Sequence, residues 1–98
     1  MLIHADDNNF KSVVLDKKET VLVDFFADWC SPCQAISPIV EDIAKDYNVC
    51  KVNVDTSPMV TRMYNIQSIP TLVVMKNGRM VNHIVGVADK EQILDILK

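Results

Sequence analysis

Long apolar runs are missing from this chain of 98 residues. No stretch approaches the roughly 20 apolar residues that are needed to cross a bilayer. The N-terminal segment, Met1 to Asp7, also has neither the basic region nor the long apolar run of a secretion signal. We therefore expect a cytoplasmic protein that does not associate with membranes.

An excess of basic residues is missing as well. The chain has 10 lysine and arginine residues against 13 acidic residues, a net charge of -3, and its basic residues are scattered singly or in short pairs such as Lys17-Lys18. Contacts with nucleic-acid phosphates need clustered Lys and Arg side chains. The composition therefore argues against a nucleic-acid partner.

Cysteine and glycine are scarce. Three cysteines are an odd number and a poor framework for structural disulfides. In a chain without a secretion signal, a close pair such as Cys30 and Cys33 indicates a catalytic or metal-binding role instead. The chain has only two glycines, and it has no internal repeat, low-complexity segment or linker. Its length suits one domain, residues 1–98.

Apolar segments of two different periods alternate along the chain. The segment 21–27 is apolar almost throughout and rich in β-branched and aromatic residues, which is typical of a central strand covered on both faces. From Pro32 the apolar residues Ile36, Val40 and Ile43 recur at helical spacing. Similar patterns predict strands at 2–4, 49–54, 71–75 and 80–87, and helices after 6–9, at 59–64 and after the capping residue Asp89.

The predicted order of elements is β-α-β-α-β-α-β-β-α, which indicates an α/β fold. Alternation in the first half implies parallel strands with right-handed crossovers. Asn77-Gly78 is a strong hairpin signal that adds an antiparallel pair. We expect a mixed central sheet of about five strands with helices on both faces.

The segment Trp29-Cys30-Ser31-Pro32-Cys33 lies between a predicted strand and a predicted helix. This switch places Cys30 at or near the helix N-cap, where free N–H groups and the positive end of the helix dipole favour a thiolate. Cys33 follows on the same helical face, within bridging range. The pair can therefore cycle between dithiol and disulfide: Cys30 attacks a disulfide of a partner, and Cys33 resolves the mixed disulfide.

Resolution needs a deprotonated Cys33, which the helix should bury. Asp24 is a lone acid in an otherwise apolar strand, so desolvation should raise its pKa and make it a proton acceptor near neutral pH. Lys51, on the neighbouring predicted strand, could tune Asp24 electrostatically. The alternative is a structural acid paired with Lys51.

These segments together resemble the thioredoxin family. The segment 23–33 is similar to the active-site strand and loop of that family, Ser68-Ile69-Pro70-Thr71 to its cis-proline segment, Lys76-Asn77-Gly78 to its hairpin, and Val85-Gly86-Val87 to the loop that borders the active site. The matches occur in the right order across essentially the whole chain.

The resemblance implies a protein disulfide reductase of the cytosolic type, which has no cofactor and is re-reduced by a dedicated thioredoxin-reductase-type electron donor. Its partners would be disulfide-containing proteins, and we expect a monomer. The resemblance assigns Cys30 as the attacking thiol, Cys33 as the resolving thiol and Asp24 as the buried acid, with Lys51 and a cis Pro70 completing the predicted catalytic set. The implied apolar docking surface consists of Trp29, Ile69, Pro70, Gly86 and Val87.

Two positions depart from the family's usual pattern next to the cysteines. Ser31 stands where glycine is usual, and because the dipeptide between the cysteines tunes the redox potential, this residue affects the potential. Phe26 stands where tryptophan is common, which removes a buried indole ring and leaves the mechanism intact.

Other interpretations stay open at this stage. A zinc site would need two ligands besides Cys30 and Cys33, and the candidates Cys50, His4 and His83 are scattered along the chain. An oxidase or isomerase of the same fold, or a scaffold that only binds partners, are further alternatives. We interpret Cys50 as an inert buried residue, and four methionines on predicted elements as packing residues: Met59, Met63, Met75 and Met80.

Overall fold

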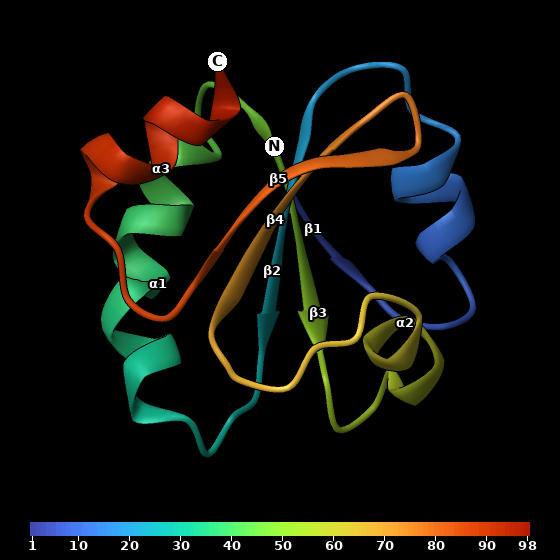
Figure 1. Ribbon diagram of the computed structural model, residues 1–98, viewed down its shortest axis with the longest axis horizontal. Coiled ribbons are helices and arrows are strands. Elements are labelled where there is room, and N and C mark those ends of the chain that lie inside the picture. Colours follow the sequence, from blue (N-terminus) through green and yellow to red (C-terminus); the bar gives the residue numbers. More distant parts are fainter.

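A computed structural model describes residues 1–98, and its five strands form one mixed sheet in the order β1-β3-β2-β4-β5 (Figure 1). The strands are β1 (Leu2–Ala5), β2 (Val21–Phe26), β3 (Asn48–Asn53), β4 (Thr71–Lys76) and β5 (Arg79–Val85), and the helical elements are η1 (Lys11–Leu15), α1 (Ser31–Ile43), α2 (Pro58–Met63) and α3 (Lys90–Leu97). The predicted fold class and element order are confirmed.

Strand directions follow the predicted pattern in the first half of the chain. Both β1 and β2 pair with β3 in parallel, so the carboxyl ends of these three strands lie at the same edge of the sheet. The strand β4 runs antiparallel to β2, and β5 antiparallel to β4. The predicted central strand, β2, therefore lies in the middle of the sheet. The antiparallel β2–β4 pairing is a feature that the order of elements did not determine.

The two faces of the sheet carry separate apolar cores because side chains alternate along each strand. On one face η1 and α2 cover strand residues such as Phe25 and Val52, and Phe10 at the start of η1 packs with them. On the other face α1 and α3 cover strand residues such as Leu22 and Leu72. Figure 1 shows α1 and α3 on one side of the strands and α2 on the other. The prediction of helices on both faces is confirmed.

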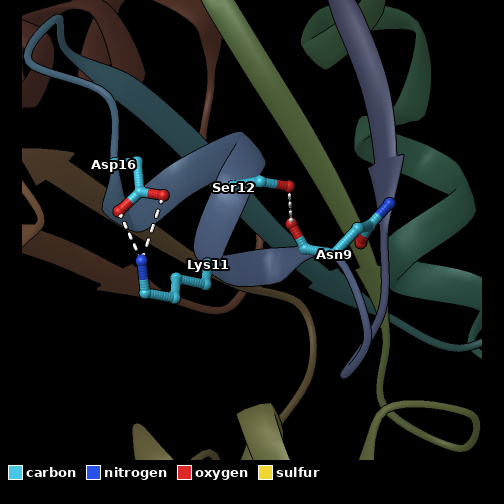
Figure 2. A network of polar contacts seen from close by, with 4 residues as sticks. All are labelled: Asn9, Lys11, Ser12 and Asp16. Carbon is cyan, nitrogen blue, oxygen red and sulfur yellow. Dashed lines mark hydrogen bonds and ion pairs between the residues drawn. The ribbon is translucent and has the colours of Figure 1, made fainter.

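The first helical element is a short π-helix that begins after Phe10. Its surface holds an ion pair between Lys11 Nζ and Asp16 Oδ1 at 3.0 Å. Ser12 Oγ donates a hydrogen bond to the carbonyl oxygen of Asn9 at 3.0 Å (Figure 2). These contacts lie far in sequence from the cysteine pair and involve exposed side chains.

Turn and cap signals in the sequence are confirmed. Asn77 and Gly78 both have positive φ angles in the β4–β5 hairpin. Asp89 accepts a hydrogen bond from the backbone N–H of Gln92, while the Gln92 side chain accepts one from the Asp89 N–H.

The interpretation of the methionines as packing residues is wrong for three of the four. Met75 is buried, but Met59, Met63 and Met80 are 67%, 59% and 49% exposed. The two on α2 lie on its outer side, and Met80 lies on the edge strand β5, whose side chains are exposed except for the half-buried Ile84. None of the helices combines the length and the apolar composition that a membrane-crossing helix needs.

Candidate functional site: the Cys30–Cys33 disulfide

Cys30 and Cys33 form a disulfide at the start of α1, with 5.3 Å between their Cα atoms. Cys30 is the N-cap residue in an extended conformation, and its Sγ accepts a hydrogen bond from the backbone N–H of Cys33 at 3.2 Å. Pro32 lies in the first turn, where its missing N–H costs no hydrogen bond. The structure confirms both the predicted N-cap position and the predicted bridging range.

Both sulfur-bearing residues are nearly inaccessible. Cys30 is 4% and Cys33 is 5% exposed, and they pack with Ala27 against Phe26 and Ile69. The burial of Cys33 was expected from its position on the inner face of the helix. The sequence did not predict that Cys30 is buried to the same extent. Cys30 is buried because segments distant in sequence cover the N-terminus of α1.

One of these covering segments contains Pro70. The Ile69–Pro70 peptide bond is cis, as the resemblance implied. The carbonyl oxygen of Ile69 lies 3.8 Å from Cys30 Sγ, and the N–H of Gly86 donates to the carbonyl oxygen of Pro70 at 2.8 Å. The structure therefore brings Ile69, Pro70 and Gly86 together beside the disulfide. Val87 lies one residue further on and is exposed.

Trp29 is the most exposed aromatic side chain next to the disulfide. It is 69% exposed, and its indole Nε1–H donates to Asp55 Oδ2 at 2.8 Å. Asp55 follows β3, and the loop after β2 carries Trp29, so the parallel pairing of these strands delivers both residues to the same edge of the sheet. Sequence reasoning did not identify Asp55, because no local signal distinguishes it from other surface acids.

Asp24 lies within β2 and is 1% exposed, as predicted. It is opposite Lys51 in β3 and Leu72 in β4, and its Oδ1 has no hydrogen-bond partner. Burial raises the pKa of Asp24 to about 6, and the positive charge of Lys51 lowers it by a smaller amount. Because Asp24 forms no ion pair with Lys51, the alternative of a directly paired structural acid does not describe this carboxylate.

A partly open cavity of about 300 Å³ lies beside Cys33. Cys33 and Lys51 both line it, so these two residues border one space that water can enter. The remaining lining residues are Phe26, Ala27, Asp28, Gln34 and Ser37. The sequence analysis identified Cys33 and Lys51 as site residues, but it did not identify Ser37. Ser37 lies next to Lys51 only because α1 packs over β3.

The residues considered as further zinc ligands lie elsewhere. Cys50 faces the core on the opposite side of the sheet, and burial raises its pKa to about 12. Its thiol therefore stays protonated and inert, as interpreted from the sequence. His4 and His83 are exposed, on β1 and β5. No group of three or more His, Cys, Asp or Glu side chains is placed to hold a metal ion.

A disulfide that caps a helix at the carboxyl edge of parallel strands, next to a cis-proline, defines a class of protein that exchanges thiols and disulfides. The family model for thioredoxin matches residues 1–98. The chain belongs to the thioredoxin family, and it is a thiol-disulfide oxidoreductase with a redox-active Cys30–Cys33 pair.

Individual relatives agree with this assignment. A thioredoxin of Buchnera aphidicola subsp. Baizongia pistaciae is 42% identical over 100 residues, which cover 98% of this chain and 92% of the relative. Thioredoxin 1 of a Nostoc species is 44% identical over 96 residues, which cover 94% of this chain and 90% of the relative. The crystal structure of a reduced Schistosoma mansoni thioredoxin pre-protein has a TM-score of 0.90 at 35% identity, over 98% of this chain and 94% of that one.

Proposed function

We propose that this chain reduces disulfides in other proteins, with Cys30 as the attacking thiol and Cys33 as the resolving thiol. The Cys30 thiolate attacks one sulfur of the substrate disulfide, and the other sulfur leaves and takes up a proton. The Cys33 thiolate then attacks Cys30 Sγ, so that the second substrate sulfur leaves and the Cys30–Cys33 disulfide forms. Two electrons pass from the dithiol to the substrate.

The observation that carries this proposal is the position of the two sulfur atoms relative to α1. Cys30 is the N-cap, and the Cys33 N–H points at its Sγ. A thiolate at Cys30 would keep this hydrogen bond and gain from the positive end of the helix dipole. Cys33 lies within the helix, is nearly inaccessible and lines the partly open cavity, which suits a thiol that attacks only Cys30.

Asp24 is the proton acceptor for Cys33 in this proposal. Three observations support this role: its carboxylate is buried, its Oδ1 has no partner, and its pKa is raised to about 6. Such a group can accept a proton near neutral pH and release it again. Asp24 lies on the face of β2 that carries Leu22, which is the face covered by α1.

Substrates would dock on the surface formed by Trp29, Ile69, Pro70, Gly86 and Val87. The Ile69 carbonyl next to Cys30 Sγ suits an extended substrate segment that pairs with the backbone beside the disulfide. We propose that a thioredoxin-reductase-type donor regenerates the dithiol on the same surface. We further propose that residues 1–98 act as one monomeric domain in a reducing compartment such as the cytoplasm, where a dithiol is maintained.

An insulin-reduction assay tests the two thiols. We expect Cys30→Ser to abolish reduction and Cys33→Ser to stop it after the first exchange, with a mixed disulfide trapped on Cys30. Cys50→Ala, which removes the inert thiol, is the matched control and should retain activity. Full activity in either active-site variant would overturn the proposal.

Two further measurements separate the alternatives. A strongly reducing midpoint potential of the Cys30–Cys33 pair would favour the reductase over an oxidase or isomerase. Partners that bind a variant with both cysteines replaced by serine as well as the parent chain would favour a scaffold.

A further inference from the structure

The ammonium group of Lys51 is held by α1 and not by Asp24. Lys51 Nζ donates a hydrogen bond to Ser37 Oγ at 3.4 Å, and it lies 4.6 Å from the centre of the Phe26 ring. The ring face attracts a cation within about 6 Å. Lys51 therefore has two contacts that fix its tip, although its neighbour across the strands is the buried carboxylate of Asp24.

The hydrogen-bonding capacity of Ser37 explains why it can hold a cation. Ser37 Oγ donates its one proton to Glu41 Oε2 at 3.1 Å. An ammonium group can only donate, so a serine that accepts from Lys51 must send its own proton elsewhere. Glu41, one helical turn after Ser37, takes that proton and adds a negative charge behind the hydroxyl. The chain of contacts therefore has one direction, from Lys51 through Ser37 to Glu41.

Lys51 needs such a contact because it stands between two open spaces. It lines the cavity of about 300 Å³ beside Cys33 and a second pocket of about 320 Å³ next to the end of β1. A lysine has a flexible stem and a strongly hydrated ammonium group. Without a fixed acceptor, hydration in these spaces would compete with any position near the buried carboxylate.

We propose that Ser37, supported by Glu41, is a positioning residue that holds the Lys51 ammonium on the wall of the cavity shared with Cys33, and so sets the positive charge next to Asp24. The effect on catalysis rests on the proposed role of Asp24, whereas the positioning of Lys51 does not.

The other groups around Asp24 do not offer an equivalent charge. On β4 its neighbour Leu72 is apolar. On α1 the titratable groups on this side are Cys33, which is neutral as a thiol or in the disulfide, and Glu41, which acts through Ser37. The pockets that Lys51 lines also contain Asp28, His4 and Asp6. Among all the charged groups around Asp24, only Lys51 has a resolved effect on its pKa, which it lowers.

Ser37→Ala tests the proposal directly. Alanine has a high helix propensity, so α1 should remain folded. The freed ammonium should move towards water, and the Asp24 carboxylate should lose part of its stabilisation. We expect the Asp24 titration, followed by carboxyl NMR in the oxidised protein, to shift upwards by about half a pH unit. The acid limb of the pH profile for mixed-disulfide resolution should shift equally, which is about a twofold slower rate at pH 6.

Three companion variants make the result specific. Ser37→Thr keeps the hydroxyl and should titrate like the parent chain. Glu41→Gln removes the charge behind Ser37 and should shift Asp24 in the same direction as Ser37→Ala, but less. Ser12→Ala removes a hydroxyl on η1 that donates a hydrogen bond to the Asn9 carbonyl oxygen, far from Lys51. Neither readout should therefore change (Figure 2).

The two readouts separate this proposal from the proposed function. An unchanged or lowered Asp24 titration in Ser37→Ala, or an equal shift in Ser37→Thr, would overturn the positioning role. If Asp24→Asn left the acid limb of the resolution rate in place, Asp24 would not be the proton acceptor. The NMR titration of Ser37→Ala would still decide whether Ser37 positions Lys51, because it does not depend on turnover.

Discussion

Asp24 shows how one buried side chain can lower the stability of a fold. Its carboxylate is buried in β2, and Oδ1 has no hydrogen-bond partner. An ionised group in such a place is costly, and the nearby positive charge of Lys51 offsets this only in part. This cost raises the pKa of the Asp24 carboxyl group, which therefore gains and loses its proton near neutral pH.

The stability of the oxidised protein should fall as the pH rises from about 4 to about 6. The pKa of Asp24 is raised from 3.8 to about 6 by folding, so in this range the folded state binds more protons than the unfolded state. Raising the pH then favours unfolding, by about 3 kcal/mol in total for this group. Chemical denaturation between pH 4 and pH 8 measures this decline.

Asp24→Asn removes the titrating group and provides the comparison. Its stability should lack the decline over this range, and it should exceed that of the parent chain at pH 8. A decline of the same size in Asp24→Asn would show that other groups cause it.

At the scale of elements, α2 is capped by a residue from another part of the chain. The Asp7 carboxylate accepts hydrogen bonds from the backbone N–H groups of Met59 at 3.1 Å and Val60 at 2.9 Å. The residue at the N-cap position, Ser57, makes no capping hydrogen bond, and its Oγ is buried without a partner. The loop after β1 is thereby fastened to α2.

Asp7→Ala should therefore destabilise the protein, whereas Ser57→Ala should not. Loss of a capping carboxylate costs about 1 kcal/mol, and up to about 2 kcal/mol, so Asp7→Ala should lower the free energy of unfolding by this amount. Ser57→Ala removes an unsatisfied buried hydroxyl and should leave that free energy unchanged or raise it. Urea denaturation at pH 7 compares the two. A larger loss in Ser57→Ala would contradict this account of the cap.

At the scale of the whole molecule, the β4–β5 hairpin is in contact with η1. Gly78 has a φ of 74°, and a Cβ atom placed there would lie 2.6 Å from the carbonyl oxygen of Leu15. Gly86 also has a positive φ, 93°, but the space around it is open. The two glycines therefore differ in the contact they permit and resemble each other in backbone conformation.

Gly78→Ala should destabilise the protein more than Gly86→Ala. Both variants would force an L residue to a positive φ, which costs about 1–2 kcal/mol. Gly78→Ala must also displace the η1 backbone, so its loss should exceed about 2 kcal/mol. Thermal unfolding of the pair measures the difference. Equal losses would show that the close approach to Leu15 relaxes without cost.

Much of the fold and of the redox site followed from local patterns. The switch from strand to helix placed Cys30 at the N-cap of α1, because the period of apolar residues changes between Ala27 and Pro32. The Asn77-Gly78 turn and the Asp89 cap depend on neighbouring residues only, so they could also be predicted from the sequence. The burial of Asp24 followed from the apolar strand around it.

What the sequence determined by itself is therefore the order of the elements, the helix-capping disulfide at Cys30 and Cys33, and the lone acid in the central strand. Only the tertiary structure decided the contacts made across the sheet edge and between layers: Trp29 with Asp55, Asp7 with α2, and Ser37 with Lys51. The reason is physical. Turns, caps and periodicity are set by residues a few positions apart, whereas these contacts join groups brought together only by strand order and by the packing of helices on the sheet.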